Sequence, residues 1–181
     1  MVGAMRYALI LSLVLPMLLA ACATLDENAC RTGDWQSIGQ HDGAAGRTSD
    51  YVANHAKACG KYGISPNITA WEAGRQQGLP LYCTPRRAWE EGARGHSIRN
   101  VCPAADLANL ERQNRRGLTW YRIGRDIDDS EREISRINHE LAGLAPDDPS
   151  RPALYSERAA LRLDIVTSHA EQLLYRYREE I

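Results

Sequence analysis

The segment SPNITAWEAGRQQGLPLYC (residues 65–83) and the segment that follows it, TPRRAWEEGARGHSIRNVC (residues 84–102), decide the fold because they repeat one pattern. Each begins with a hydroxyl residue and a proline, continues with Trp-Glu-x-Gly, and ends in cysteine. A hydroxyl oxygen accepts a hydrogen bond from the first helical turn, where proline needs no donor. The pattern therefore predicts two short helices, at about 66–77 and 85–94, that end at Gly78 and Gly95.

A looser form of the pattern extends the helical prediction in both directions along the chain. Each cysteine after residue 22 is followed by a tryptophan, and each tryptophan by a glycine three or four residues later. We expect two earlier helices at about 33–41 and 49–59. The Trp and Gly positions are typical of close helix packing, because glycine lets backbones approach and aromatic rings fill small cores. The alternative is an aromatic ligand site with Trp35, Trp71, Trp89 and Arg75.

The cysteines predict two disulfide bonds. Cys30, Cys59, Cys83 and Cys102 enclose a stretch of 73 residues that has only 14 Leu, Ile, Val, Trp or Tyr, a thin core that covalent closure would stabilise. Three pairings are open, and we favour pairing of neighbours along the chain. The alternative is a zinc site, because His55 and Cys59 are four residues apart on one helix face.

The first 22 residues are typical of an exported protein. A single charge, Arg6, precedes an apolar run that ends in Leu19-Ala20-Ala21-Cys22. This ending resembles the lipobox of bacterial lipoproteins, which implies cleavage before Cys22 and acylation of that residue. The resemblance also implies an outer-membrane destination, because Ala23 rather than Asp follows the cysteine. A plain signal peptide cleaved near Ala21 is the alternative.

The C-terminal part predicts a long helical hairpin. Apolar residues recur at alternating spacings of three and four, which is typical of a coiled coil, and the loop APDDPSRP (residues 145–152) must interrupt the helix. The first arm would present Trp120, Ile123, Ile127, Ser130, Ile134, Ile137, Leu141 and Leu144. The second arm would present Tyr155, Ala159, Leu163, Val166, Ala170, Leu173 and Tyr177, with a smaller opposite stripe of Leu154, Leu161, Ile165 and Tyr175. A separate helix at about 103–116 would join it to the cysteine region, with Gly117 as a kink or joint.

Three motifs resemble a family of uncharacterised Gram-negative lipoproteins, the domain-of-unknown-function family numbered 2799. They are DWQSIGQHDGAAG (residues 34–46), GRQQGLPLYC (residues 74–83) and GARGHSIRNVCP (residues 92–103). The resemblance implies a small envelope lipoprotein without assigned activity, and it supplies no catalytic residues.

Charge and motif content exclude some functions and leave others open. With 22 Lys and Arg against 23 Asp and Glu, the chain has no global positive charge for nucleic-acid binding. His41 and Asp42 are candidates for acid–base catalysis, but neighbours in sequence rarely face each other, and Asp42-Gly43 is typical of a turn. We therefore expect no enzyme, with a hydrolase that uses His41 and Asp42 as one alternative.

These observations predict an all-α protein in four parts. They are a lipoprotein signal peptide (1–21), a tether (22–29), a disulfide-stapled helical head (30–102) and an antiparallel coiled-coil hairpin (103–181). We expect a lipid anchor on Cys22 in the outer membrane, facing the periplasm, and a role as a structural or protein-interaction module without a cofactor. Its partner would be an envelope protein or a second copy bound through the hairpin. The alternative is a binding module for peptidoglycan or another envelope polymer.

Overall fold

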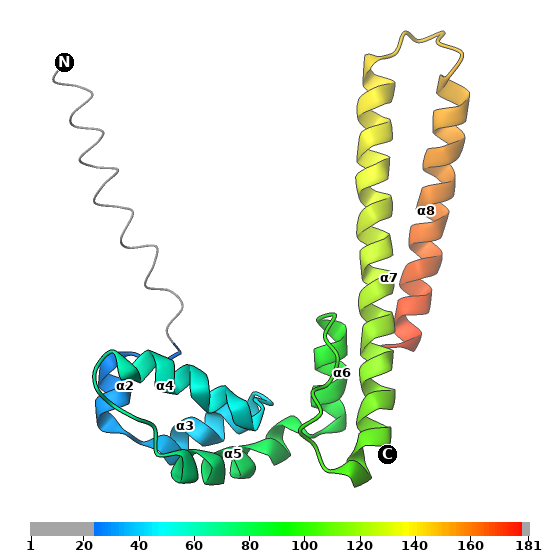
Figure 1. Cartoon of the computed structure of the whole chain (residues 1–181). Helices are drawn as coiled ribbons and strands as arrows, with labels where there is room; N and C mark the ends of the chain where they lie inside the picture. The colour runs from blue at the N-terminus through cyan, green and yellow to red at the C-terminus, as the bar shows by residue number, and fades with distance from the viewer. Residues whose placement is uncertain (1–23, 179–181) are drawn as a thin grey trace, which may run out of the picture. The chain divides into compact units, whose positions relative to one another are not determined.

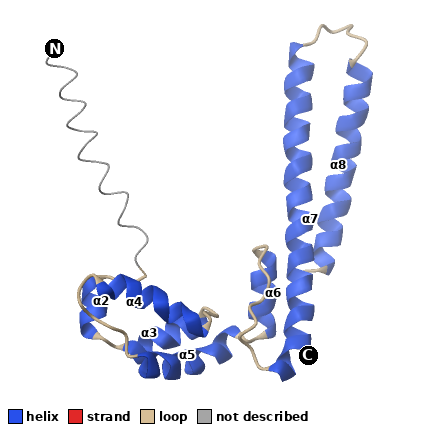
Figure 2. Cartoon of the chain, viewed as in Figure 1, coloured by secondary structure: helices blue, strands red, loops and turns tan. Residues whose placement is uncertain are grey.

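The computed structural model describes residues 24–178, which fold into helices joined by loops and turns, with no strand in that range (Figures 1 and 2). The all-α prediction is confirmed. The predicted signal peptide and the Cys22 anchor lie outside the described residues. The helices are α2 (Glu27–Thr32), α3 (Trp35–Ala44), the short 3-10 helix η2 (Ser49–Tyr51), α4 (Val52–Gly60), α5 (Ile68–Tyr82), α6 (Pro85–Ala93), α7 (Ala104–Gly143) and α8 (Arg151–Leu174).

The chain divides into two compact units, one ending at Leu79 and the other beginning at Pro80, within α5. The second unit contains α6 together with α7 and α8. The boundary that we expected at residues 102 and 103 stays a prediction, because a division by contacts does not show which part folds alone.

Glycines hold α3 and α5 of the first unit in backbone contact. A β-carbon added at Gly39 or Gly43 of α3 would lie 1.9 or 2.0 Å from a carbonyl oxygen of α5. In return, a β-carbon at Gly74 or Gly78 would lie 1.9 or 2.0 Å from a carbonyl oxygen of α3. Both helices therefore present a Gly-x3-Gly face, and any larger residue there would force them apart. The packing interpretation of these glycines is confirmed.

Two buried tryptophans and a disulfide form the core of the first unit. Trp35 is 6% exposed and Trp71 is fully buried, and both pack with the disulfide between Cys30 and Cys59. The disulfide joins α2 to α4 and so links two helices that α3 separates in the sequence. Partly buried apolar side chains surround it, from Leu25, Ile38, Tyr51, Val52, Tyr62, Ile64 and Ala70.

The second unit repeats the close glycine packing between α6 and α7. A β-carbon at Gly92 would lie 2.2 Å from the Asn114 carbonyl oxygen, and one at Gly117 would lie 2.2 Å from the Trp89 carbonyl oxygen. The buried Asn114 amide donates to the carbonyl oxygens of Ala88 and His96, which fixes the end of α6 against α7. The second disulfide joins Cys83 to Cys102. Both disulfides therefore connect neighbours along the chain, the pairing that we favoured.

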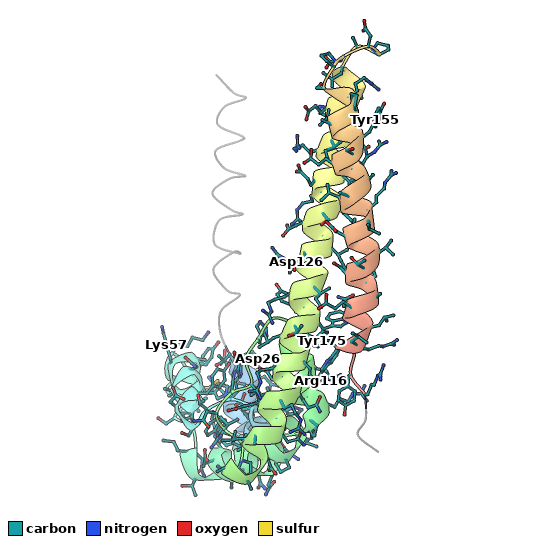
Figure 3. All side chains as sticks on the ribbon, turned by 90° about the vertical axis from the view of Figure 1, so that its right-hand side faces the viewer. Asp26, Lys57, Arg116, Asp126, Tyr155 and Tyr175 are labelled. Atoms are coloured by element: carbon teal, nitrogen blue, oxygen red, sulfur yellow. A yellow bond between two sulfur atoms is a disulfide. The ribbon has the colours of Figure 1, made fainter. Side chains whose placement is uncertain are left out.

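The helices α7 and α8 run side by side in opposite directions (Figures 1 and 3). Ile137, Leu141 and Leu154 form their buried cluster near the connecting loop, with Leu144 and Leu161 packed against it. Figure 3 shows Tyr155 at the loop end of α8 and Tyr175 at the other end, beside Arg116 of α7. Arg116 donates to the Leu174 carbonyl oxygen and Trp89 to the Tyr175 carbonyl oxygen, so the last carbonyls of α8 are bonded. Coiled-coil packing within this pair stays a prediction.

The face of α8 that contacts α7 carries the smaller of its two predicted apolar stripes, the one with Leu154 and Leu161. Leu154 is 8% exposed and Leu161 is partly buried, whereas Leu163, Val166 and Leu173 of the expected main face are at least 60% exposed. The expectation that this larger stripe closes the hairpin was wrong. The helix α8 has apolar stripes on two opposite faces, and the spacing of the residues does not determine which stripe packs against α7.

Several predicted helix limits also need correction. Gly78 lies inside α5, where it contacts α3, and the helix continues through Pro80 to Tyr82. Gly117 is not a joint, because α7 is continuous from Ala104 to Gly143. Gly95 does follow α6, with a left-handed φ of 82° that suits glycine. The helix α2 occupies part of the expected tether, and α8 ends at Leu174 rather than at the chain end.

The hydroxyl–proline pairs gave one correct and one incorrect helix start. Thr84 caps α6, because its hydroxyl oxygen accepts from the Arg87 N–H. The helix α5 begins only at Ile68, and the Asn67 side chain, rather than Ser65, accepts from the N–H of Ala70. Between residues 24 and 178, no helix is long and apolar enough to span a lipid bilayer.

Candidate functional site

The most concentrated polar arrangement in the first unit is the carboxylate of Asp42 and the side chains bonded to it. Its Oδ2 atom lies 2.7 Å from His55 Nε2 and accepts a 2.8 Å hydrogen bond from Trp71 Nε1. The His55 side chain is 3% exposed and that of Asp42 is 14% exposed. Because these three residues come from α3, α4 and α5, the carboxylate joins three helices of the unit.

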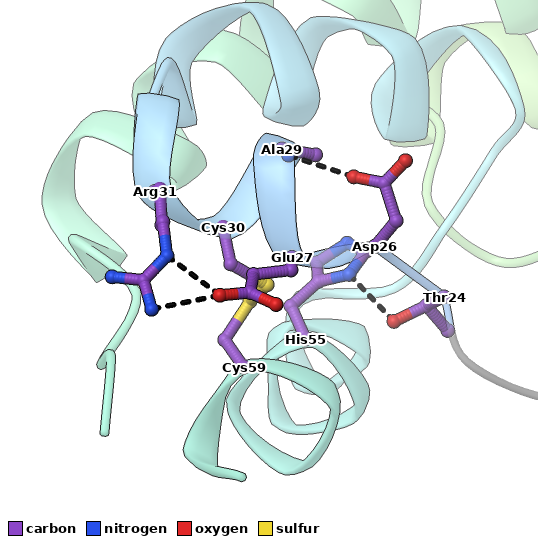
Figure 4. Close-up of a disulfide and its surroundings, with 8 residues drawn as sticks. All are labelled: Thr24, Asp26, Glu27, Ala29, Cys30, Arg31, His55 and Cys59. Atoms are coloured by element: carbon purple, nitrogen blue, oxygen red, sulfur yellow. Dashed lines mark hydrogen bonds and ion pairs between the residues drawn. A yellow bond between two sulfur atoms is a disulfide. The ribbon is translucent and has the colours of Figure 1, made fainter. Parts of the chain in front are cut away.

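The other ring nitrogen of His55 reaches the start of the described chain. His55 Nδ1 lies 2.9 Å from the hydroxyl oxygen of Thr24, so the hydroxyl, the imidazole and the carboxylate form one chain of hydrogen bonds. Figure 4 shows Thr24 beside His55, in the surroundings of the disulfide between Cys30 and Cys59. We call Thr24, Asp42, His55 and Trp71 the Asp42 cluster.

Local structure explains why these side chains meet. His55 and Cys59 are four residues apart on α4, so the disulfide to α2 also fixes the ring position one turn earlier. Asp42 directly precedes Gly43 in α3. Because Gly43 lies against the backbone of α5, the Asp42 carboxylate is close to Trp71 of that helix. The glycine contacts and the disulfide therefore determine the geometry of the cluster.

A second ion pair lies beside the cluster on α5. Arg75 donates to both carboxylate oxygens of Glu72, at 2.8 and 2.7 Å, and to the carbonyl oxygen of Arg47 at 3.0 Å. The hydrogen bonds from Arg75 lower the pKa of Glu72, and those to Glu72 raise the pKa of Arg75. Arg75 is only 6% exposed, and its guanidinium group lies 5.9 Å from the centre of the Trp71 ring. The pair therefore covers the tryptophan and ties the loop after α3 to α5.

The structure separates several of the residues that we predicted as one site. Asp42, Trp71 and Arg75 lie together, but His41 is exposed and the partner of Asp42 is His55. Trp35 and Trp71 are buried in the core, where neither ring presents a face to a ligand. Trp89 belongs to the second unit, where its ring lies 5.8 Å from that of Trp120 and 6.0 Å from that of Tyr177.

The sequence did not point to Thr24, and it did not pair His55 with Asp42. The distance in sequence explains this, because 31 residues separate Thr24 from His55 and 13 separate His55 from Asp42. No local spacing rule connects residues so far apart. The zinc alternative does not fit, because Cys59 is bonded to Cys30 and both ring nitrogens of His55 have other partners. Within residues 24–178, no group of three or more His, Cys, Asp or Glu side chains is placed to share a metal ion.

The Asp42 cluster has the component groups of a hydrolytic triad but a different geometry. In the Ser-His-Asp arrangement, Nε2 of the histidine faces the nucleophile and Nδ1 faces the carboxylate. Here Nδ1 faces the Thr24 hydroxyl and Nε2 faces Asp42. The same Asp42 oxygen is also held by Trp71, which is fully buried. The arrangement is therefore better suited to holding three helices and the Thr24 segment together than to activating a nucleophile.

Comparison with protein families identifies the segment that contains most of this site. Residues 34–119 match the model of the family described as "Protein of unknown function (DUF2799)". These residues, which we call the DUF2799 segment, are similar to that family. The resemblance drawn from the three sequence motifs is thus confirmed. Neither the curated proteins nor the solved structures include a match to the chain.

The DUF2799 segment contains the glycine contacts and most of the Asp42 cluster. It spans α3 to the first part of α7, so Asp42, His55 and Trp71 fall within it. Thr24 and Cys30 precede it, and α8 follows it. The DUF2799 segment thus includes the residues that hold α3 against α5 and α6 against α7.

Proposed function

We propose that this protein is an envelope lipoprotein, anchored through acylated Cys22 and facing the periplasm, that acts as a structural or protein-interaction module. The observation that carries the proposal is that all four cysteines after Cys22 are paired in disulfides. Structural disulfides persist in oxidising compartments such as the periplasm and are rare in the bacterial cytosol. The pairing therefore supports export, and Cys22 is the remaining cysteine of the sequence.

The leader supplies the second line of support. The sequence Leu19-Ala20-Ala21-Cys22 closes an apolar run that starts after Arg6, in the order that a lipoprotein signal requires. Each acyl methylene buried in a bilayer contributes about 0.8 kcal/mol, so two or more chains on one residue anchor a protein stably. A chain tethered in this way needs no membrane-spanning helix.

The Asp42 cluster gives this anchor a defined attachment point on the first unit. Thr24 is hydrogen-bonded to His55 and is only two residues after Cys22. Two residues of extended chain span at most about 7 Å. Acyl groups on Cys22 would therefore hold the Asp42 cluster and α2 next to the bilayer surface.

The burial of Trp35 and Trp71, two of the three tryptophans predicted as polymer contacts, favours this role over that of a polymer-binding module; the third, Trp89, is half-buried beside Trp120 and Tyr177. Aromatic side chains that bind carbohydrate must present a ring face to the ligand. Trp35 is 6% exposed and Trp71 is fully buried, so neither is available for that contact. The exposed apolar side chains are instead concentrated on α8, which is typical of a surface that binds protein.

The anchor is tested by replacing Cys22 with alanine in the full chain and following the protein in cells fed a labelled fatty acid. We expect the unchanged chain to incorporate the label and to sediment with membranes, and the C22A chain to do neither. The matched control is Ala23→Ser, which keeps Cys22 and should behave like the unchanged chain. Membrane association of the C22A chain at the level of the control would refute the proposal.

A further inference from the structure

A groove lies between α7 and α8, close to the C-terminal end of α8. Its volume is about 430 Å³, and it is lined by Thr119, Arg122, Ile123, Arg125 and Asp126 of α7 and by Glu171 of α8. All of these residues belong to the second unit, so that unit alone forms the groove. The volume is within the range of about 300–1,000 Å³ that is usual for small-molecule sites.

The position of Glu171 beside α7 is fixed by its neighbour in the sequence, Gln172. The side-chain nitrogen of Gln172 donates a 3.1 Å hydrogen bond to the Trp120 carbonyl oxygen. A β-carbon added at Gly124 would lie 3.0 Å from the same nitrogen, so the glycine lets α8 come close to α7 here. Glu171 is thereby held across the groove from the α7 residues that line it.

The charged side chains around the groove do not neutralise one another. Other arginines of α7 form ion pairs with carboxylates three or four residues away. Arg122 and Asp126 are also four residues apart, but the Arg122 guanidinium group donates to the Thr119 hydroxyl oxygen instead. Within the second unit, the Arg125, Asp126 and Glu171 side chains have no hydrogen-bond or ion-pair partner. Charges of both signs therefore remain available to a ligand.

We propose that this groove binds a short zwitterionic peptide, which has a free ammonium group at one end and a free carboxylate at the other. Arg122 uses one donor on Thr119, and a guanidinium group has five, so the others reach the peptide carboxylate. Asp126 and Glu171 accept hydrogen bonds from the ammonium group. The groove is separate from the Asp42 cluster, and the proposal does not depend on lipid anchoring.

The spacing of the charges selects a peptide of two residues. Arg122 and Asp126 lie on the same side of α7, separated by a rise of about 6 Å along the helix. Two residues of extended chain span at most about 7 Å, so the charged ends of a dipeptide match this separation. A single amino acid, whose two charged groups are joined through one carbon, is too short. Ile123, which is 8% exposed, supplies apolar surface for a small side chain.

Titration of the purified full chain with alanylalanine, followed by nuclear magnetic resonance, tests the site directly. We expect weak, millimolar binding, because charge pairs at a protein surface contribute little. The backbone signals of residues 119–126 and of Glu171 should shift. Two matched probes each lack one charge, namely the N-acetylated dipeptide and the dipeptide amide. Each should bind about tenfold more weakly than alanylalanine, because one of its ends has lost its charged partners.

Substitutions identify the groups that hold each end of the dipeptide. Arg122→Gln and Glu171→Gln remove one charge from the groove and should each weaken binding about tenfold. The matched control is Arg132→Gln, which removes an arginine that pairs with Asp129 on α7 and does not line the groove. It should bind the dipeptide like the unchanged chain. None of the three substituted side chains is buried, so the helical circular dichroism of all three variants should be unchanged.

Four outcomes would overturn the proposal. The first is the absence of shifts at dipeptide concentrations well above the millimolar range, and the second is a set of shifts confined to the first unit. The third is equal binding of the acetylated dipeptide, since the ammonium group would then play no part. The fourth is equal weakening by Arg132→Gln, because the response would then reflect the overall charge of the chain rather than the groove.

Discussion

Replacement of Gly43 by alanine tests the backbone contact between α3 and α5, on which the geometry of the first unit depends. The new β-carbon would lie 2.0 Å from the Arg75 carbonyl oxygen, where ordinary contact begins at 3.4 Å. The helices must therefore separate by about 1.4 Å, because a backbone carbonyl cannot rotate away as a side chain can. Overpacking of this kind costs roughly 3 kcal/mol at the upper end of the usual range.

A gain in helix propensity opposes this cost. Alanine in a helix is more favourable than glycine by about 1 kcal/mol, which leaves a net destabilisation of about 2 kcal/mol. For a chain of this size, that corresponds to a melting temperature lower by about 4–8 °C. The free energy of unfolding is measured by denaturant titration, with tryptophan fluorescence reporting on Trp35 and Trp71.

The matched control is Gly60→Ala at the end of α4. A β-carbon there meets no atom within 4 Å, so propensity alone should act and the variant should be neutral or stabilised by up to about 1 kcal/mol. If Gly43→Ala were as stable as Gly60→Ala, the close contact between α3 and α5 would be refuted.

Three further predictions concern the Asp42 cluster, the ion pair beside it and the hairpin. Asp42→Ala leaves the buried Trp71 and His55 N–H groups unpaired and should lower the free energy of unfolding, measured by denaturant titration, by about 2–4 kcal/mol. The control Asp50→Ala, at an exposed residue, should change it very little. Equal stabilities of the two variants would contradict the cluster. Arg75 lowers the pKa of Glu72 below 4.5, so the stabilisation is present above that pH and is lost as the pH falls through the lowered pKa. Glu72→Gln should therefore be less stable than the unchanged chain at pH 7 and equally stable near pH 2, and a difference that persists at low pH would argue against the ion pair. Ile137→Ala should lower the stability of the hairpin by about 2–5 kcal/mol in thermal melts, and Leu163→Ala by much less, since Ile137 is fully buried and Leu163 is 64% exposed. A loss at Leu163 as large as that at Ile137 would instead place the larger α8 stripe against α7.

Much of the local helical structure was predictable because its signals lie within a few residues. Thr84-Pro85 starts α6, and Gly95, with its positive φ, follows the end of that helix. The short α2 also has such signals, because Asp26 caps its start and Gly33 ends it in the left-handed region. It escaped prediction because six residues are too few to show an apolar period.

Longer-range features were not accessible from spacing. Gly117 resembles a joint in the sequence, but α6 packs against it, and the contact offsets the cost of a glycine within a helix. The face of α8 that closes the hairpin is fixed by burial of Ile137 and by the hydrogen bonds from Arg116 and Trp89 to its last carbonyls. The Gly117 contact and the inner face of α8 both depend on residues far apart in the sequence, as does the bond from His55 to Asp42.

The proposal as a whole rests on export of the chain and acylation of Cys22. The most direct test is mass spectrometry of the intact protein isolated from membranes, with free thiols alkylated before denaturation and again after it. We predict a chain that begins at Cys22, carries the mass of its acyl groups and takes up no alkylating reagent in either step. A chain that retains residues 1–21, or whose Cys30, Cys59, Cys83 or Cys102 is alkylated, would contradict the account.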